Sequence, residues 1–379
     1  MKMKSKIIVS TITLVMFGVA GVALLFNNSS KDRFETSQNN DASISSMIET
    51  YTKGKNDVKL TIGVLKSDKT NYKVFGADSK ELEPVEYEYE IGSISKTFTA
   101  AMLCKAIADG QINLDDSISK YLPLDTDTFC PTIKSLATHT SGYGEYPFDS
   151  STLSKEELEM IDSKFYEKRL NIYQGISREE MLDMIKSHVL KDKAYGWEYS
   201  NFGIAVLGTV LSEIYDTSFK LLAEDFIKND LGLTETRLGN GTGNLSNYWT
   251  WNDDDTYFAA GGMVSTVTDL LKYGRIHLND SPGYLALSHR TYQAFENDGF
   301  SMGLGWIIDP ETGYLWHNGG TSSYKSFLGI DKEHKTAVVI LSNYPSKDDE
   351  KDEDALDILG YALLDSLSNS DSDVFNVLE

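Results

Sequence analysis

Apolar and polar residues follow a strand-like pattern near both ends of the chain. Residues 59–65 and 71–75 are rich in β-branched and aromatic residues, and the polar residues 66–69 join them into a predicted hairpin. Three more strands are predicted near the other end, at residues 314–317, 326–330 and 336–341. The polar residues 331–334 join the last two of these.

The central part of the chain has helical periodicity instead. The strongest helix is predicted from Ser93 to Asp109, with one apolar face and a stop at Gly110. Further helices are predicted at residues 155–168, 178–190, 201–214, 219–229, 267–277 and 355–367. Strands at both ends with helices between them predict an α/β (α+β) fold. Its antiparallel sheet is built from both chain ends, flanked by helices and interrupted by a large, mostly helical insertion.

The first residues predict where the protein is located. Lys2, Lys4 and Lys6 precede the uncharged stretch 7–26, which is about long enough for a helix that crosses a bilayer. We expect residues 1–26 to be a retained membrane anchor with the rest of the chain outside, and the alternative is a cleaved signal that gives a secreted protein. Composition then divides the rest into three parts: a flexible linker at 27–46, a large folded domain at 47–367 and a polar tail at 368–379.

Charge and motif content exclude several classes of protein. The chain has 57 acidic and 35 basic side chains, a net charge of −22, with no basic stripe that would bind nucleic acid. It has no His-Glu-x-x-His, Cys-x-x-Cys or phosphate-binding loop, so we predict neither a metal ion nor any other cofactor. Cys104 and Cys130 are too few for a disulfide framework, and the sequence leaves open whether they pair.

The candidate chemistry begins with Ser93 and Lys96. Residues three apart lie on one face of a helix, so the lysine amine can reach the serine hydroxyl and act as its base if burial lowers the lysine pKa. The same Ser-x-x-Lys spacing recurs at Ser117 and at Ser322, where the context predicts a turn and a strand entrance. Ser93 is therefore the candidate nucleophile, although on its own it would be interpreted as a helix N-cap.

Two further motifs change that interpretation. They are Tyr199-Ser200-Asn201 and His317-Asn318-Gly319-Gly320, and the segment around Ser93 is Gly92-Ser93-Ile94-Ser95-Lys96-Thr97-Phe98-Thr99. Together the three segments resemble the signature elements of the serine β-lactamase and penicillin-binding protein superfamily, in particular its class C β-lactamase and DD-carboxypeptidase branch. The segments 136–142 and 260–269 resemble the same family.

The resemblance implies a β-lactamase/transpeptidase-like fold and a role for each matching residue. Ser93 would be the nucleophile, Lys96 its proton partner, and Tyr199 a general base that Lys96 holds near ionisation or shares a proton with. The backbone N–H of Ser93 and one from the strand after the third motif would form the oxyanion hole. Asn201, His317, Gly319 and Gly320 would contact the substrate. His139, in a family-like segment, is expected to be structural.

The third motif departs from the Lys-Thr-Gly of class C β-lactamases. A neutral histidine does not hold a β-lactam carboxylate as a fixed lysine charge does. The resemblance therefore implies a hydrolase of D-alanyl peptides or esters, with peptidoglycan or a D-alanylated envelope polymer as its substrate and partner. A class C-like β-lactamase acting on β-lactams is the alternative. A catalytically weak penicillin-binding or wall-binding regulatory protein is the alternative of another class.

Overall fold

The computed structural model describes residues 43–124, 128–146, 153–344 and 355–369. Its centre is a nine-stranded antiparallel sheet of described residues, in the order β3-β2-β1-β12-β11-β10-β9-β8-β7. The strands are β1 (Leu60–Lys66), β2 (Lys69–Phe75), β3 (Glu81–Leu82), β7 (Gln293–Phe295), β8 (Phe300–Met302), β9 (Ile307–Ile308), β10 (Leu315–Gly320), β11 (Lys325–Asp331) and β12 (Thr336–Ser342). Because β1 pairs with β12, the two ends of the chain complete one sheet.

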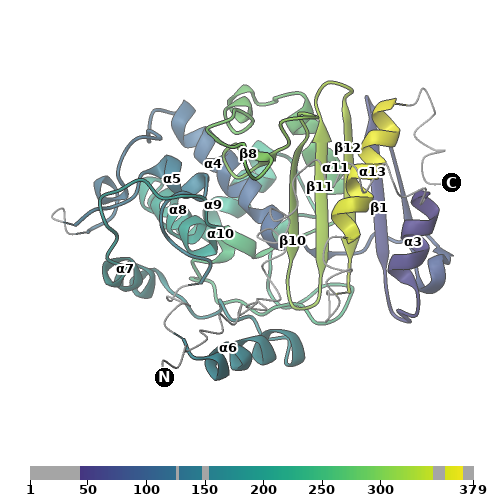
Figure 1. Cartoon of the computed structure of the whole chain (residues 1–379), viewed down its shortest axis with the longest axis horizontal. Coiled ribbons are helices and arrows are strands. Elements are labelled where there is room, and N and C mark those ends of the chain that lie inside the picture. The colour runs from purple at the N-terminus through teal and green to yellow at the C-terminus, as the bar shows by residue number, and fades with distance from the viewer. Residues whose placement is uncertain (1–42, 125–127, 147–152, 345–354, 370–379) are drawn as a thin grey trace, which may run out of the picture.

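Helices cover both faces of this sheet, so every residue of β12 is buried. Figure 1 shows α3 (Ile44–Thr52) and α13 (Ala355–Asn369) on the near face and α11 (Val267–Leu278) behind it. Leu356, Leu359, Leu363 and Leu367 of α13 pack in the apolar core on the near face. These leucines form one apolar face of α13, and this face covers the near side of the sheet.

The remaining helices form a region beside the sheet, on the left in Figure 1. Its longest members, α4 and α8, are almost entirely buried because they pack on each other and on α10. A small sheet, β4-β6-β5, joins this region to the segment before Ser93. These elements are β4 (Tyr89–Glu90), α4 (Ser95–Ala108), α5 (Ile133–Ala137), α6 (Lys155–Asp162), α7 (Arg178–Ser187), α8 (Asn201–Ile214), α9 (Phe219–Asp225), β5 (Arg237–Leu238), α10 (Phe258–Gly261) and β6 (Met263–Ser265).

The predicted fold class is confirmed, with differences at the boundaries. Strands β7, β8 and β9 were not predicted, because segments of two or three residues are too short to show an alternating pattern. Helix α3 begins at Ile44, inside the predicted linker, because Ser43 caps it by accepting a hydrogen bond from the N–H of Ser46. Helix α13 runs to Asn369, two residues beyond its predicted end, and the rest of the predicted tail lies outside the described residues.

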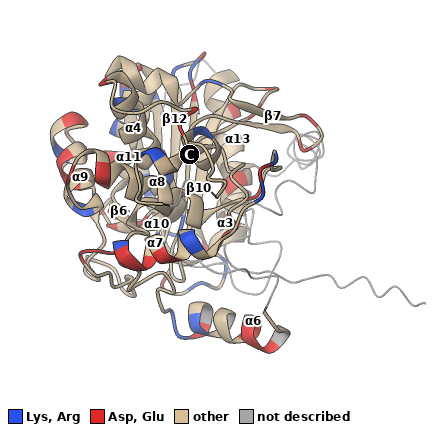
Figure 2. Ribbon diagram, turned by 90° about the vertical axis from the view of Figure 1, so that its left-hand side faces the viewer, with Lys and Arg blue, Asp and Glu red and all other residues tan. Residues whose placement is uncertain are grey.

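Charged side chains of both signs are interspersed on the outer helices α7 and α9 (Figure 2). Within the described ranges, no helix is long and apolar enough to cross a membrane. The predicted anchor at 7–26 and most of the predicted linker lie outside those ranges.

Candidate active site

Ser93 lies in a tight turn between β4 and α4, at the short 3₁₀ segment η2 (Gly92–Ile94). Gly92 has a φ of 48°, and a Cβ there would lie 2.5 Å from the backbone nitrogen of Gly320. A Cβ on Gly319 would lie 2.0 Å from the carbonyl oxygen of Ile91 and 2.9 Å from the nitrogen of Ser93. Only glycines allow β10 to approach the serine turn this closely, and the approach brings the amides of Ser93 and Gly320 near each other.

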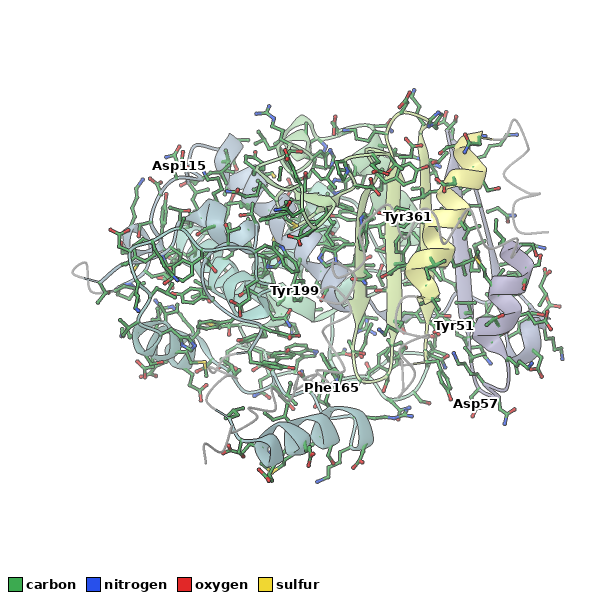
Figure 3. All side chains as sticks on the ribbon, in the orientation of Figure 1. Tyr51, Asp57, Asp115, Phe165, Tyr199 and Tyr361 are labelled. Atoms are coloured by element: carbon green, nitrogen blue, oxygen red, sulfur yellow. The ribbon has the colours of Figure 1, made fainter. Side chains whose placement is uncertain are left out.

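The structure brings Ser93, Lys96 and Tyr199 together. Lys96 Nζ donates a hydrogen bond to Ser93 Oγ at 2.9 Å, and the Tyr199 hydroxyl donates to the same atom at 2.6 Å. Lys96 also donates to the carbonyl oxygen of Ala260 at 2.6 Å. Tyr199 lies near the middle of the molecule, between the helical region and the sheet (Figure 3). Ser93 Oγ therefore contacts both the amine of Lys96, in the first turn of α4, and the phenol of Tyr199, just before α8.

Burial controls the pKa values of both partners. Lys96 is fully buried, and loss of hydration lowers the pKa of its amine well below its usual range, against an opposing effect of the Glu145 carboxylate. Burial likewise raises the pKa of the Tyr199 phenol above its ordinary value, while its hydrogen bond with Ser93 acts in the other direction. Burial thus shifts Lys96 towards the neutral amine and Tyr199 towards the protonated phenol.

Lys96 was expected either to hold Tyr199 near ionisation or to share a proton with it. Burial raises the pKa of the phenol, which favours the shared proton. Lys96 Nζ lies over the tyrosine ring, 4.9 Å from its centroid, and its hydrogen bonds go to Ser93 and Ala260. The two residues are connected through the serine oxygen.

His139 holds the segment that carries Tyr199. Its carbonyl oxygen accepts a hydrogen bond from the N–H of Glu198 at 2.9 Å, and its Nδ1 accepts one from the N–H of Ser200 at 3.1 Å. Its ring packs on the phenol with centroids 4.8 Å apart, and its φ of 57° places it in the left-handed region. These contacts give His139 a structural role, because it holds Glu198 and Ser200, the residues on both sides of Tyr199.

Asn201 and His317 flank the same site. Asn201 opens α8 and donates from Nδ2 to the Tyr173 hydroxyl at 3.1 Å. The His317 ring lies 6.5 Å from the Tyr199 ring, centroid to centroid, and its Nδ1 donates to the carbonyl oxygen of Asn318 at 2.6 Å. Burial, with a smaller effect of Lys96, lowers the pKa of His317 to about 3, so this histidine is neutral at pH 7.

A narrow pocket opens beside Ser93, and sequence reasoning missed most of its residues. Besides Ser93, Asn201 and Gly320, it is lined mainly by aromatic side chains: Tyr173, Trp249, Trp251 and Tyr257. The only sequence signal was the pair of tryptophans two residues apart in an otherwise polar segment.

Behind the pocket lies Glu90, three residues before the nucleophile and 4% exposed. Its carboxylate accepts hydrogen bonds from the N–H of Trp249 and the hydroxyl of Thr321, while burial raises its pKa to about 7.

The other two serines with the Ser-x-x-Lys spacing have different hydrogen-bond partners. Ser117 caps a short 3₁₀ turn, and the Ser322 hydroxyl accepts a hydrogen bond from Trp249 Nε1. Cys104 and Cys130 are both free thiols, which answers the question of their pairing. In the part of the chain that the structure describes, no cluster of His, Cys, Asp or Glu is arranged to hold a metal ion.

Comparison with known proteins gives one family. The chain matches the family described as Beta-lactamase over residues 59–362. It is 26% identical over 297 residues to a "Beta-lactamase" of Pseudomonas fluorescens, which covers 70% of this chain and 74% of the relative. It is 23% identical over 325 residues to "Protein flp" of Staphylococcus aureus strain COL, covering 77% of this chain but spanning only 61% of that relative.

A solved structure agrees with the fold. The octameric penicillin-binding protein homologue from Pyrococcus abyssi superposes with a TM-score of 0.65 at 22% identity, covering 86% of this chain and 76% of that one.

Proposed function

The chain belongs to the β-lactamase family of serine hydrolases, and we propose that it is a cell-envelope hydrolase that forms an acyl-enzyme on Ser93. The observation that carries the proposal is the position of Ser93 Oγ, 2.9 Å from the Lys96 amine and 2.6 Å from the Tyr199 hydroxyl. A serine hydroxyl needs such a neighbouring base to become a nucleophile.

In this proposal Lys96 is the base. Its lowered pKa increases the fraction of neutral amine at pH 7, and the amine that donates to Ala260 keeps a lone pair for the Ser93 proton. The serine oxygen attacks the substrate carbonyl carbon, and the N–H groups of Ser93 and Gly320 stabilise the oxyanion. The Tyr199 phenol, protonated because its pKa is raised, passes a proton to the departing alcohol or amine and regains one from Lys96. Water then releases the acyl group by the reverse sequence.

For the substrate we favour D-alanyl peptides or esters of the cell envelope. His317 occupies the place of the lysine found in class C β-lactamases, and its pKa of about 3 leaves it without charge at pH 7. That site therefore lacks the fixed charge that would hold a β-lactam carboxylate.

A β-lactamase is the second candidate function, and Lys325 is the residue that favours it. Its Nζ lies 4.0 Å from the place that a Cβ on Gly320 would take, so a cation is available near the end of β10. If this cation holds a carboxylate, Lys325→Ala should raise KM for nitrocefin and leave KM for a neutral ester unchanged.

The experiment that tests the proposal is a substrate panel with the purified full-length protein in detergent. D-Ala-D-Ala peptide, D-alanylated teichoic acid, nitrocefin and simple esters are compared by kcat/KM. Turnover of D-alanyl substrates well above nitrocefin supports the proposal. Rapid turnover of nitrocefin alone supports the β-lactamase, and absence of all turnover supports a binding or regulatory protein.

The proposal also places the catalytic domain outside the cytoplasmic membrane, tethered by residues 7–26, because this stretch is uncharged and follows three lysines. Mass spectrometry of the native protein should find an amino terminus before Phe26, and a mature start beyond that residue would show that the anchor is removed.

A further inference from the structure

Glu90 lies in β4, on a segment whose backbone is firmly held. It pairs with Val264 of β6, and the N–H of Ile91 donates to the carbonyl oxygen of Met263 at 3.0 Å. Burying a carboxylate costs free energy unless hydrogen bonds replace the lost hydration. Glu90 is 4% exposed, and each of its two oxygens accepts a hydrogen bond from a distant part of the chain. Its side chain therefore links two other segments to the strand that leads to Ser93.

The first of these segments is the turn that joins β10 to β11. The Thr321 hydroxyl donates to Glu90 Oε2 at 2.7 Å. The same hydroxyl oxygen accepts the N–H of Ser323 at 3.4 Å and the N–H of Tyr324 at 3.2 Å. A hydroxyl has one proton and two lone pairs, so both lone pairs are in use and the proton goes to Glu90. Because Gly320 immediately precedes this turn, the bond to Glu90 restrains the position of the Gly320 N–H.

The second segment is the loop that contains Trp249, part of the wall of the pocket beside the nucleophile. The backbone N–H of Trp249 donates to Glu90 Oε1, and its indole N–H donates to Ser322 Oγ at 2.7 Å. The Tyr324 hydroxyl donates to the carbonyl oxygen of Ser246 at 2.8 Å. The β10–β11 turn and the Trp249 loop are thus joined to each other as well as to Glu90.

Both partners of Glu90 act on it only as donors. A backbone N–H never accepts a hydrogen bond, and the Thr321 hydroxyl has no lone pair left. An ionised carboxylate offers an acceptor oxygen to each of them, whereas an amide offers one oxygen and one NH₂ group. Glu90→Gln would keep the size of the side chain and place its NH₂ group against one of the two donors.

This arrangement bears on the proposed oxyanion hole, which needs the N–H groups of Ser93 and Gly320 fixed relative to each other. The close approach of Gly319 to the Ser93 turn holds Gly320 from one side, and the bond from Thr321 to Glu90 holds it from the other. Such donors stabilise a transition state only when they are already in place. A displacement of about 1 Å can cost about 10²-fold in rate.

We infer that Glu90 is a positioning residue for the oxyanion hole: by holding Thr321, its carboxylate fixes the Gly320 N–H relative to Ser93. This inference rests on the proposed function and adds to it a residue that acts through others, since Glu90 is not part of the described pocket lining. The oxyanion forms only in the transition state. Loss of the carboxylate should therefore lower kcat and leave KM nearly unchanged.

The test measures kcat and KM of the full-length protein on an activated ester. The assay is run at pH 8, above the pKa of about 7 to which burial raises Glu90. Glu90→Gln should lower kcat roughly tenfold to 100-fold, with KM changed by less than about threefold.

Phenylboronic acid gives a second readout. The Ser93 oxygen bonds to boron and passes its proton to Lys96, and the boron becomes a tetrahedral anion with one oxygen in the oxyanion hole. Because this adduct resembles the transition state, its affinity should fall by about the same factor as kcat. A loss of stability alone would not change that affinity in a protein that is still folded.

Two replacements of Thr321 test the same hydrogen bond from its other end. Thr321→Val removes the hydroxyl at nearly constant shape and should lower kcat by a factor similar to that of Glu90→Gln. Thr321→Ser keeps the hydroxyl and should retain kcat. Because Glu90 and Thr321 act through one bond, the losses in Glu90→Gln and Thr321→Val should not multiply in the double variant.

Asp269→Asn is the matched control. Asp269 is 5% exposed and also accepts from a backbone N–H, that of Glu235 at 2.8 Å, and from a threonine hydroxyl, that of Thr236 at 2.9 Å. Neither partner belongs to the β10–β11 turn or to the Trp249 loop. Asp269→Asn should lower the melting temperature and leave kcat and the boronate affinity unchanged.

The outcomes separate this inference from the proposed function. A folded Glu90→Gln enzyme with normal kcat and boronate affinity would overturn the inference, as would fully multiplicative losses or an equal loss of kcat in Asp269→Asn. If Glu90→Gln does not fold, equal kcat in Thr321→Ser and Thr321→Val would overturn it. Each of these results leaves the serine hydrolase intact. Absence of both ester turnover and a boronate adduct in the wild-type protein would instead overturn the proposed function itself.

Discussion

Two regions of this molecule share the Ser-x-x-Lys pattern and use it differently. At Ser93 the lysine three residues later is fully buried and reaches back to the serine hydroxyl. At Ser117 the hydroxyl is hydrogen-bonded to Ser119, and Lys120, with 56% of its side chain exposed, pairs with Asp116 instead. Spacing therefore makes the contact possible, and the surroundings decide whether it forms.

The two lysines also show how the surroundings set the chemistry. Loss of hydration lowers the pKa of Lys96, whereas the hydrogen bond to Asp116 raises the pKa of Lys120. The first change favours a neutral amine that accepts a proton, and the second favours a permanent cation. In the proposed mechanism Lys96 can act as a base because helix α4 is buried at its first turn.

The largest difference should appear when the two serines are replaced. Ser93→Ala removes the proposed nucleophile and should lower kcat on an activated ester by roughly 10⁶-fold, as removal of the nucleophile does in serine hydrolases. Ser117→Ala should leave kcat unchanged, because Ser117 only caps a short turn. Full activity in Ser93→Ala would remove Ser93 from the mechanism.

Replacing Lys96 and Lys120 should give a smaller difference in kcat than replacing the two serines. Lys96→Ala removes the proposed base and should reduce kcat by about 10²–10⁴-fold. Lys120→Ala, with its side chain in solvent, should have no effect on kcat and serves as the control. Both proteins are checked by thermal melting, since loss of folding in Lys96→Ala would imitate loss of catalysis. A folded Lys96→Ala enzyme with normal kcat would show that another group takes the serine proton.

Tyr199→Phe tests whether the phenol and the amine form one proton path. Both contact the same oxygen of Ser93, so the losses in the two single variants should not multiply. We expect Tyr199→Phe to lose about 10²-fold in kcat, and the double variant to be about as slow as the worse single. Fully multiplicative losses would mean independent roles, and a near-normal Tyr199→Phe would leave Lys96 to act alone.

The smallest effect concerns pH. If neutral Lys96 is the base, kcat/KM should fall about tenfold per pH unit below the lowered lysine pKa, and should not fall again near pH 10 through ionisation of Tyr199, whose pKa is raised. Lys120→Ala should show the same profile. Activity that instead rises with ionisation of a group near pH 10 would return the role of base to the tyrosine.

The sequence predicted the sheet, the main helices and the contacts of Ser93 with Lys96 and Tyr199, because each depends on local periodicity or on short motifs. It did not predict the raised pKa of Tyr199, which arises from packing between α8, His139 and the sheet. Nor did it predict the pocket, since Trp249 and Glu90 are far apart in the chain and meet only through the fold. Strands β7 to β9 were not predicted because each is held by pairing with its neighbour in the order β10-β9-β8-β7, not by its own sequence pattern.

The central claim is that Ser93, alone among the serines with this spacing, forms the acyl-enzyme. A fluorophosphonate or a labelled penicillin is incubated with the full-length protein, and the modified peptide is identified by tandem mass spectrometry. The account predicts one label, on Ser93, that is lost in Ser93→Ala and retained in Ser117→Ala. A label on Ser117 or Ser322, or a label that persists in Ser93→Ala, would contradict it.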